Sequence, residues 1–585
     1  MATGTLTDVN GGAWLVAEVT DVFSPERLSD DHRMIAATAH EFMTQEVVPA
    51  IDRLEQKDWT LARELVAKAG ALGLIGTDVP EALGGVGLDK AASIIVGEAV
   101  GWSASFATTF GAETGLTIIP ILCFGTDEQK QNYLPRLASG EILGAYALSE
   151  SGSGSDALAA RTRAVKQADG SFVVSGEKMW ITNGGFADVF IVFAKVEGEH
   201  FSAFIIERSS PGVASGKEEH KMGLHGSSTT PLILQEVVVP ASHVLGEIGR
   251  GHKVALNTLN YGRFKLAAMC SGGAKLAMAE AAAYAASRKQ FNQPISNFGA
   301  IQHKLGEMTA RTYAVESALY RTCGLIDGAL EGTRGLPTVL EEFAIEASML
   351  KVAASEMLDY VLDENVQIHG GNGFVKDYPA ERHYRDARVN RIFEGTNEIN
   401  RLLVPGMLAR RAIKGTLPII AAAKALQDEL LASPALSTTP SGQLAPEATL
   451  VAGMKKVGLA VLGTAMQTYG EKLPDRQEVL CFAADIVTDA FLAESALLRA
   501  RQAAADDPQR QALHEAAARI VVHTAASRVD ASAKEALAAM AQGDTLRTLL
   551  AALRRWLKAV PADLVTARRA LAVETVQKRG YVFES

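Results

Sequence analysis

The spacing of hydrophobic residues changes several times along this chain, and each change predicts a different kind of structure. Apolar residues recur with a helical period from about residue 29, give way to short β-branched and aromatic runs near residue 144, and return to a helical period after residue 250. Prolines, serines and glycines then interrupt the pattern before a last helical block. We therefore expect an N-terminal arm (1–28), a helical domain (29–143), a middle β domain (144–250), a helical bundle (251–415), a linker (416–447) and a C-terminal helical domain (448–585).

The middle segment is typical of a compact, mostly antiparallel β domain. Residues 171–175 follow an Asp-Gly turn, and the runs 189–196, 201–208 and 232–239 are rich in β-branched and aromatic residues. The flanking helical blocks contain alanine-rich segments that suit close helix packing. The order of the blocks predicts a mostly α protein with one β domain, which does not by itself name a reaction.

The composition allows large cores and narrows the class of partner. Of 585 residues, 48% are hydrophobic and 21% are charged, and the formal net charge is −10 without a long basic run, which argues against nucleic acid as the main partner. The four cysteines lie far apart and the 12 histidines form no ligand cluster, so we expect reduced thiols and no metal site. The first ten residues show no targeting pattern, and no apolar run reaches about 18 residues. We therefore expect a cytoplasmic protein without a membrane span.

One acidic residue in an apolar setting is the strongest candidate for chemistry. Glu394 follows Ile392 and Phe393 and precedes a Gly-Thr turn, and Thr396 is a good N-cap residue for a helix that begins there. If Phe393 and an apolar substrate shield this carboxylate from water, its pKa is raised from about 4.3 towards neutrality, as a general base requires. The spacing fits equally well with a solvated charge near a helix N-terminus.

Three further stretches are suited to hold a polar ligand that contains a ring. The loop 146–156 is rich in hydroxyls and glycines, but it fails as a dinucleotide fingerprint because the third glycine is missing and a strand follows. Trp180 and Thr182 share a face of a strand at period two and would offer an aromatic plane and a hydroxyl. Glycines in 367–374 end a long helix and would let backbone approach a cofactor. Each stretch also fits a purely structural role, as a surface loop, a core tryptophan or a helix cap.

Together these stretches resemble the acyl-CoA dehydrogenase family over roughly residues 30–415. The matching segments, in chain order, are YALSESGSGSD, GEKMWITNGG, QIHGGNGF and RDARVNRIFEGTNEI. The segments LNYGRF and FGAIQ, together with the extra C-terminal helices, are most similar to the very-long-chain branch. The resemblance implies a helical domain, a β-barrel-like domain and a four-helix bundle, plus an extra C-terminal helical domain. It also implies FAD as the cofactor and a homodimer in which the extra domain takes the place of a second dimer.

The resemblance further implies a reaction, the FAD-dependent α,β-dehydrogenation of fatty acyl-CoA to trans-2-enoyl-CoA in fatty acid β-oxidation. Medium to very long acyl chains would be the substrates. Glu394 would remove the α-proton while the β-hydrogen leaves as hydride to flavin N5, and an electron-transfer flavoprotein would receive the electrons. The backbone N–H of Glu394 and a flavin ribityl hydroxyl would bind the thioester carbonyl, and a donor in such a setting contributes about 3–4 kcal/mol.

Carried over residue by residue, the resemblance assigns most of the site to cofactor contacts. Arg288 and Phe291 would reach FAD across the dimer, and Gln302 would replace a family glutamine that is Gly299 here. Ser149 and Ser151 stand where the family usually has Thr and Pro. The residues expected to bind FAD are Tyr146, Leu148, Ser149, Ser155, Trp180, Thr182, Arg288, Phe291, Gln302, Gln367, Gly370, Gly371, Thr396 and Glu398. The residues expected near the substrate are Ser155, Asn260, Arg263, Phe393 and Gly395.

Two other functions fit the same sequence features. An acyl-CoA oxidase would pass the electrons to oxygen, and peroxide release would reveal it. A relative that serves respiratory-complex assembly would use the chain as a scaffold with secondary dehydrogenase activity. Separately, leucines and basic residues over 546–560 form an amphipathic basic pattern. This pattern predicts either a peripheral contact with the anionic inner surface of a membrane or a helix packed on its own domain.

Overall fold

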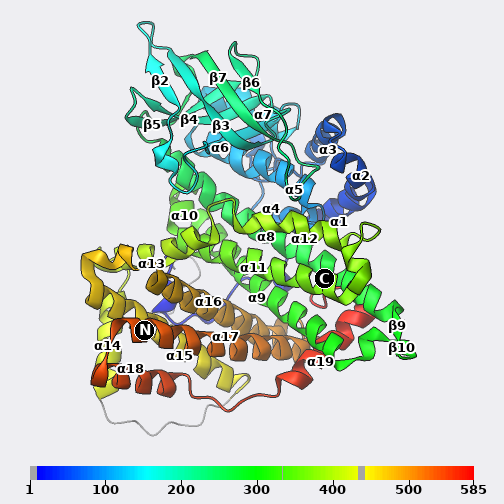
Figure 1. The fold of residues 1–585 in the computed structure, drawn as a ribbon, viewed down its shortest axis with the longest axis vertical. Helices are drawn as coiled ribbons and strands as arrows, with labels where there is room; N and C mark the ends of the chain where they lie inside the picture. The colour runs from blue at the N-terminus through cyan, green and yellow to red at the C-terminus, as the bar shows by residue number, and fades with distance from the viewer. Residues whose placement is uncertain (1–9, 333, 432–441, 585) are drawn as a thin grey trace.

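The computed structural model describes residues 10–332, 334–431 and 442–584. Figure 1 shows the β domain at one end of the molecule, the helical bundle in the middle and the C-terminal helices at the other end. The N-terminal helices lie beside the β domain and cover its base (Figure 1). The mostly helical architecture with one β domain and an extra C-terminal helical domain, predicted from the sequence, is confirmed.

Polar caps start the helices of the N-terminal domain. Ser29 and Thr126 each form a capping box, and the carboxylates of Asp58 and Asp89 each accept a backbone N–H. A π-helical segment, η7 (Ala112–Ile118), joins α5 to α6 in one apolar rod. The helices are α1 (Asp30–Phe42), α2 (Ile51–Glu55), α3 (Trp59–Ala71), α4 (Lys90–Val100), α5 (Ala104–Gly111), α6 (Ile119–Phe124) and α7 (Asp127–Ala138).

The middle domain is an eight-stranded sheet in the order β6-β7-β3-β2-β4-β5-β8, with β1 paired to β4. Most neighbours are antiparallel, whereas β4 pairs in parallel with β1 and β2. Along β4 the side chains alternate: Phe190 belongs to the core inside the domain, and Phe193 packs towards the N-terminal helices. The strands are β1 (Gly144–Ala147), β2 (Arg163–Lys166), β3 (Phe172–Thr182), β4 (Val189–Val196), β5 (His200–Glu207), β6 (Val213–Ser215), β7 (Thr229–Val239) and β8 (Val244–Leu245).

Long helices with many small residues form the bundle. The 37 residues of α8 span about 55 Å. A small hairpin joins α8 to α9, and the 3-10 helix η11 (Gly370–Phe374) follows α11. The elements are α8 (Gly251–Ser287), β9 (Lys289–Gln290), β10 (Gln293–Pro294), α9 (Gly299–Leu330), α10 (Leu336–Glu342), α11 (Ala344–His369), α12 (Ala380–Ala387) and α13 (Asn397–Ile413).

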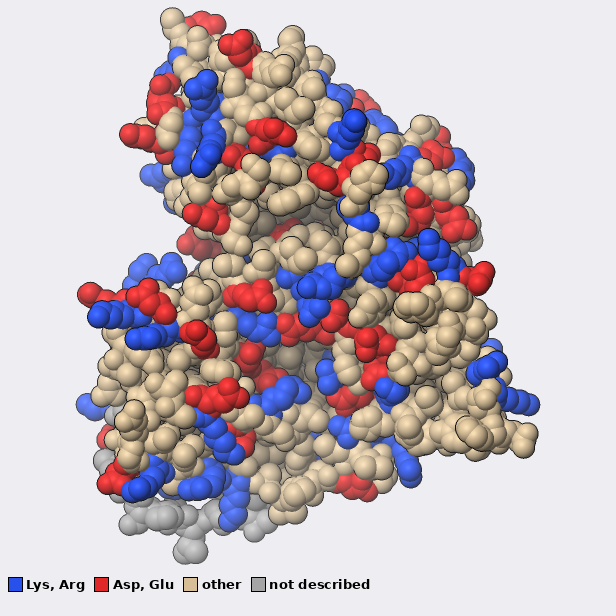
Figure 2. Space-filling model, viewed as in Figure 1, with Lys and Arg blue, Asp and Glu red and all other residues tan. Residues whose placement is uncertain are grey.

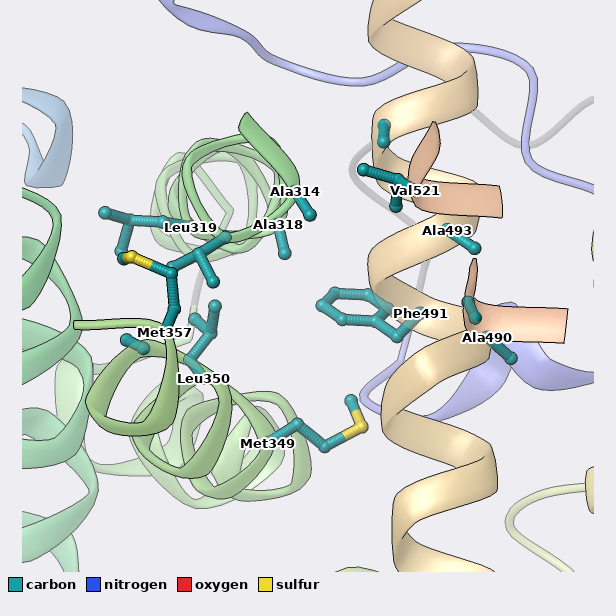
Figure 3. Packing of buried hydrophobic residues seen from close by; sticks show 14 of the residues in the cluster. Ala314, Ala318, Leu319, Met349, Leu350, Met357, Ala490, Phe491, Ala493 and Val521 are labelled. Atoms are coloured by element: carbon teal, nitrogen blue, oxygen red, sulfur yellow. The ribbon is translucent and has the colours of Figure 1, made fainter. Parts of the chain in front are cut away.

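The C-terminal helices share one hydrophobic core with the bundle. Figure 3 shows Phe491 of α16 facing Met349 of α11, with Ala314 and Ala318 of α9 beside them. The last helix returns to pack against α8 and α9. The helices are α14 (Ile419–Leu431), α15 (Ala445–Tyr469), α16 (Gln477–Asp506), α17 (Gln511–Met540), α18 (Gly543–Trp556) and α19 (Leu564–Lys578).

Two segments differ from the plain arm and linker that the sequence predicts. The predicted linker contains α14, whose Ile419 and Leu426 are buried; Pro418 precedes the helix, a position that proline favours, instead of ending structure. Residues 432–441 lie outside the described residues. The arm carries Trp14, which is 1% exposed and packs against Phe491 of the C-terminal domain.

Two helical stretches are long and apolar enough to cross a bilayer by length and composition alone. They are Ala104–Phe124 and Ala445–Asp475, and 72% and 56% of their most apolar stretches of 18 residues are buried inside the protein. The first lines the cavity described below. We therefore interpret both as core helices, which pass the same test.

Candidate active site

A deep cavity separates α5 and η7 from α8, α11 and the turn before α13. It contains about 960 Å³ of space not filled by protein atoms, its open mouth included. Glu394, Phe393 and Thr182 belong to its wall, and the lining continues along α8 from Gly262 to Leu276. Most other lining residues are small or apolar, among them Gly101, Ala107, Gly111, Gly115, Met269, Gly273, Leu358 and Leu362.

The turn that carries Glu394 has an unusual backbone. Glu394 has φ +59° and Gly395 has φ +76°, so two consecutive residues adopt the left-handed region. Arg263 Nε donates to the Glu394 carbonyl at 3.1 Å, and Lys351 Nζ and Asn400 Nδ2 donate to the Gly395 carbonyl at 2.7 and 2.8 Å. A left-handed non-glycine residue costs on the order of 1 kcal/mol or more, and such strain persists where the surroundings fix it.

The carboxyl group of Glu394 is held without a partner. Its Oε2 is buried and makes no hydrogen bond with the described residues, while the side chain as a whole is half-buried because one side faces the cavity. Burial raises the pKa of Glu394 to about 7, and the positive charges of Arg263 and Lys351 oppose this increase without forming an ion pair. The carboxyl group therefore changes protonation near neutral pH, as a general base must.

The close approach of α8 fixes the position of this carboxyl group. A Cβ added to Gly262 would lie 2.8 Å from Oε2 of Glu394, so only glycine fits here without movement. No backbone carbonyl of the described residues accepts a hydrogen bond from the N–H of Glu394. That donor is therefore available to a ligand that lies against the turn.

On the β-domain side, Thr182 belongs to the cavity wall, and Trp180 lies two residues before it on β3. A bulge in the pairing of β3 with β7 interrupts the strict period-two alternation, and Trp180 within it has φ +57°. The Trp180 side chain is 56% exposed, which is unusual for a tryptophan that has no ligand to cover it. Thr182 contributes to the same cavity wall as Glu394.

The loop before β2 is anchored by a buried ion pair that sequence reasoning did not single out. Lys178 Nζ donates to Glu150 Oε1 at 2.7 Å and to the Leu148 carbonyl at 3.2 Å. Burial works against the charge, but Lys178 and Thr162 outweigh it and lower the pKa of Glu150 to about 2. The pair holds Leu148 and Ser149 beside the strand that carries Trp180, and Ser155 lies exposed further along the loop.

Near the turn, Tyr146 and Arg263 complete the surroundings of the carboxyl group. Burial and the nearby Glu394 raise the pKa of Tyr146 well above its usual range. Arg263 is 4% exposed, and its Nη1 donates to Asn260, which is buried and lies outside the cavity lining. In the structure, then, Asn260 orients Arg263.

At the start of α13, the Thr396 hydroxyl accepts the Ile399 N–H at 3.3 Å, so the predicted N-cap is present. Glu398, one of the residues expected to bind FAD, is exposed on the first turn of α13. It has no ion pair with the described residues.

The remaining residues expected to bind the cofactor lie far from this site. Phe291 is 87% exposed in the turn between β9 and β10, which Figure 1 shows at the end of the bundle away from the β domain. Along α8, Arg288 is 26 residues beyond Gly262, which corresponds to about 39 Å. Gly370 and Gly371, where an added Cβ would meet nothing, follow a helix end that packs on Tyr284 near the same hairpin. The residues of this second group are Arg288, Phe291, Gln302, Gln367, Gly370 and Gly371.

The residues around the mouth fit an aromatic cofactor with polar edges. Trp180 offers an exposed ring, Thr182 a hydroxyl, and the anchored loop at Leu148 and Ser149 additional polar groups. Trp180 combines a left-handed backbone with a largely exposed side chain, so its ring is not part of the core. These residues would suit a flavin ring held beside the cavity.

Sequence reasoning missed Gly262, Lys351 and Asn400. Lys351 is fully buried in α11, and a lysine flanked by apolar residues in an otherwise alanine-rich helix is the one signal that marked it. Gly262 carries no local signal, because its role depends on a contact with a turn over a hundred residues away. Asn400 carries none either, because its role depends on how the following helix, α13, sits against that turn.

The amphipathic pattern at 546–560 belongs to α18 and the turn after it. Leu553 and Trp556 are buried, and Leu546, Leu549, Leu550 and Leu557 pack against the core, whereas Val560 is 86% exposed. The apolar face is therefore largely covered by its own domain. Basic side chains mix with acidic ones over the face drawn in Figure 2.

Comparison with known proteins places matches along nearly the whole chain. Family models described as acyl-CoA dehydrogenase N-terminal, middle and C-terminal domains match residues 29–141, 145–237 and 249–408, and a further acyl-CoA dehydrogenase C-terminal domain model matches 453–555. A probable acyl-CoA dehydrogenase of Bacillus subtilis (strain 168) is 46% identical over 584 residues, which cover 98% of each chain.

Two further relatives bear on the cofactor and on the branch. A crystal structure of an acyl-CoA dehydrogenase complexed with FAD from Bacillus anthracis is 46% identical, with a TM-score of 0.96, and the match covers 98% of this chain and 100% of that one. A very long-chain specific mitochondrial acyl-CoA dehydrogenase of Bos taurus is 43% identical over 344 residues, which cover 57% of this chain and 51% of the relative.

Proposed function

This chain belongs to the acyl-CoA dehydrogenase family and is an FAD-dependent oxidoreductase, and from this premise we propose that it converts long-chain fatty acyl-CoA to trans-2-enoyl-CoA with Glu394 as the base. The observation that carries the proposal is the unpaired carboxyl group at the head of an apolar cavity. A carboxylate with a pKa near 7 that faces an alkyl chain is suited to abstract a proton from carbon.

Glu394 and the residues around it have separate roles in the proposed reaction. Glu394 takes the α-proton, and its own backbone N–H donates to the thioester carbonyl, where negative charge develops; such a donor supplies about 3–4 kcal/mol. Arg263, Lys351 and Asn400 hold the turn, so the carboxylate meets the α-carbon in one fixed position. FAD held at this site would supply the hydride acceptor for the β-hydrogen. Trp180 and Thr182 would hold its ring, with Tyr146, Leu148 and Ser149 beside it.

The depth of the cavity supports long chains as substrates. From Gly262, which faces Glu394, to Leu276 the lining extends 14 residues along α8, or about 21 Å. An extended alkyl chain adds about 1.3 Å per methylene, given C–C bonds of about 1.5 Å. An extended chain that followed α8 would therefore reach Leu276 at roughly its sixteenth carbon.

We propose a homodimer in which each flavin is bound by two chains. The cavity residues and the exposed group around Phe291 and Gly370 lie about 39 Å apart along one chain, so one flavin ring cannot contact both groups of the same protomer. Large exposed aromatic residues at one end of the bundle, Phe291 and Phe374, support an interface there. Light scattering on the purified protein tests this proposal, and a monomer that retains FAD would contradict it.

We also propose an electron acceptor, a location and a membrane contact for the enzyme. The electron acceptor is an electron-transfer flavoprotein; peroxide released in step with product under air would instead identify an oxidase. The location is the cytoplasm. Most leucines of α18 pack within its own domain, which leaves little apolar surface for a membrane. A peripheral contact with an anionic membrane therefore stays a prediction. Flotation of the protein with anionic vesicles tests this contact.

The reaction itself is tested by product analysis. Purified protein is mixed anaerobically with straight-chain acyl-CoA thioesters of four to twenty carbons, and flavin bleaching and 2-enoyl-CoA are followed. We expect the fastest bleaching between about twelve and sixteen carbons, given the depth of the cavity. If no chain length bleaches the flavin, the proposed reaction is wrong; if only four- to six-carbon chains do, the proposed chain length is wrong.

A further inference from the structure

A continuous set of polar contacts connects the C-terminal domain to the turn that carries Glu394. It begins at Asp485 on α16, whose Oδ1 accepts from Arg401 Nε of α13 at 2.7 Å. The two Nη groups of Arg401 donate to the two oxygens of Glu356 on α11, at 2.8 and 2.9 Å. Arg401 thus donates from all three of its guanidinium nitrogens and joins three helices.

The same contacts continue into the active site. Glu356 Oε1 accepts from Asn397 Nδ2 at 3.0 Å, and the amide oxygen of Asn397 accepts from Lys351 Nζ at 2.7 Å. Lys351 also donates to the carbonyl of Gly395 at 2.7 Å, one residue beyond Glu394. Asn397 and Lys351 are 2% and 0% exposed, so these last contacts form in a dry region where they are strong and geometrically strict.

Each side chain in this set contacts one neighbour through one atom and the next neighbour through another. Each contact therefore constrains the next. The amide of Asn397 donates towards Glu356 and Ser355 and accepts from Lys351, which leaves it one orientation. Arg401 holds both carboxylate oxygens of Glu356 from the other side. Asp485 is the contact that holds Arg401 from the side of the extra domain.

We propose that Asp485 is a positioning residue for catalysis: through Arg401, Glu356, Asn397 and Lys351 the C-terminal domain sets the placement of the Glu394 turn. The inference rests on the proposed function and adds a role for a domain whose described residues contribute nothing to the cavity wall. α13 packs against α16, so the route is short. Because the side chains of Glu356 and Asp485 are each 39% exposed, solvent screens the first contacts, and we expect an effect of a few-fold.

The test compares Asp485→Asn with Asp489→Asn. Asp489 lies one turn further along α16 and pairs with Arg528 of α17, inside the C-terminal domain, so its replacement removes a similar ion pair without touching the contacts to the active site. We expect Asp485→Asn to lower kcat about three- to ten-fold, within the range of couplings seen between distant sites, with KM and flavin content unchanged. Asp489→Asn should remain within about two-fold of the wild type.

The pH profile provides a readout that a purely structural role would not change. A loosened turn admits water to Glu394 and lowers its pKa, against the same neighbours Tyr146, Arg263 and Lys351. The acidic limb of the kcat profile should therefore move to lower pH in Asp485→Asn and stay in place in Asp489→Asn. Identical kcat values and profiles in the two variants would overturn the proposal.

A second variant covers the case in which Asp485→Asn does not fold. Arg401→Lys keeps the charge but cannot bind Asp485 and both oxygens of Glu356 at once, so it should show the same fall in kcat and the same shift of the limb. A wild-type profile for Arg401→Lys would also overturn the proposal. Wild type and Glu394→Gln are run alongside: a wild type that does not bleach with acyl-CoA refutes the proposed function, whereas an active wild type with an unaffected Asp485→Asn refutes only the positioning role.

Discussion

The Glu394 side chain lies in surroundings that disfavour its own charge. Burial raises its pKa to about 7, whereas an unfolded glutamate titrates near 4.5. Between these values the folded protein keeps a proton that the unfolded chain has released, so the free energy of unfolding falls as pH rises. Above about pH 7 the full penalty is present, which means that the buried Glu394 lowers the stability of the fold there, as is common for residues kept for function.

Replacing Glu394 with Gln removes this ionisation. We expect Glu394→Gln to be more stable than the wild type by about 2 kcal/mol at pH 8.5, a value reduced from the full pKa shift because one side of the group meets the cavity. At pH 4.5, where the wild-type group is already neutral when folded, the difference should nearly vanish. Urea unfolding at the two pH values measures it. The same difference at both would show that the pKa is not raised.

Gly262 is the second residue on which the account depends. A methyl group there would lie 2.8–2.9 Å from the carboxyl atoms of Glu394 and push them from the α-carbon. Gly262→Ala should lower kcat about 100-fold, because a displacement of about 1 Å at a reacting group has that effect. Gly406→Ala on α13, where an added Cβ meets nothing, is the control. Full activity of Gly262→Ala would mean that the carboxyl group is not held against α8.

Single residues were predictable where the signal is local. Glu394 follows an apolar pair, and Thr396 was expected to cap the next helix because hydroxyls favour that position. The roles of Gly262 and Lys351 could not be predicted, although the apolar neighbours of Lys351 are a local signal, because both act on a turn that is distant in the sequence and brought near only by the packing of α8 and α11.

At the scale of elements, the proposed function predicts that α8 limits the length of the acyl chain. Gly273 lines the cavity 11 residues beyond Gly262, or about 17 Å along the helix. In Gly273→Leu a side chain would close the cavity at the depth of roughly the thirteenth carbon. We expect kcat/KM for sixteen-carbon acyl-CoA to fall at least ten-fold, since a blocked pocket discriminates by steric exclusion.

Substrates of eight carbons serve as the internal control for Gly273→Leu. They should react at the wild-type rate, because they end before residue 273. An equal loss for short and long chains would indicate a damaged fold, and an unchanged rate for sixteen carbons would place the acyl chain elsewhere.

Helices and strands were predictable from the sequence where one spacing of hydrophobic residues persists over the whole element. The run 189–196 coincides with β4 because β-branched and aromatic residues on both faces fit a buried strand. The bulge in β3 and the π-helical η7 were not predictable, because both are local departures stabilised by the site they help to form. α14 was missed because Pro418 can either precede a helix or lie in a linker.

At the scale of the molecule, the chain ends lock the C-terminal domain onto the bundle. Arg499, 1% exposed, pairs with Glu26 of the N-terminal arm and Glu316 of α9, each at 2.6 Å. Tyr581 near the other end donates to the same Glu316 at 2.7 Å. Burial alone would raise the pKa of Glu26, but Arg499 lowers it to about 2. This pair therefore stabilises the fold above about pH 4.5 and stops doing so as pH falls towards 2.

Arg499→Met would leave the buried carboxylate of Glu26 without its cation, while Glu316 would keep one cation, Lys275, whose Nζ lies 2.7 Å away. We expect a loss of about 3–5 kcal/mol at pH 7, measured by denaturant unfolding, because one partner of a buried pair is removed. Arg547→Met on exposed α18 should change stability by less than about 0.5 kcal/mol. If both variants unfold alike, the buried network does not hold the domains together.

The order of domains was predictable from the sequence, since each block has its own hydrophobic period. The docking of residues 10–28 and 579–584 in one network was not, because it joins chain ends through contacts over hundreds of residues. The same holds for the contacts from Asp485 to Lys351, whose members lie on three helices.

The central claim is that Glu394 removes the α-proton at a flavin-covered cavity, and stopped-flow bleaching of the bound FAD under nitrogen tests it most directly. Wild type and Glu394→Gln are each loaded with FAD and mixed with hexadecanoyl-CoA at pH 8. We expect complete bleaching of the wild type, and for Glu394→Gln the same yellow flavin content with a bleaching rate lower by at least 10⁴-fold, in line with the loss of an essential proton acceptor. Bleaching of Glu394→Gln at the wild-type rate would contradict the account.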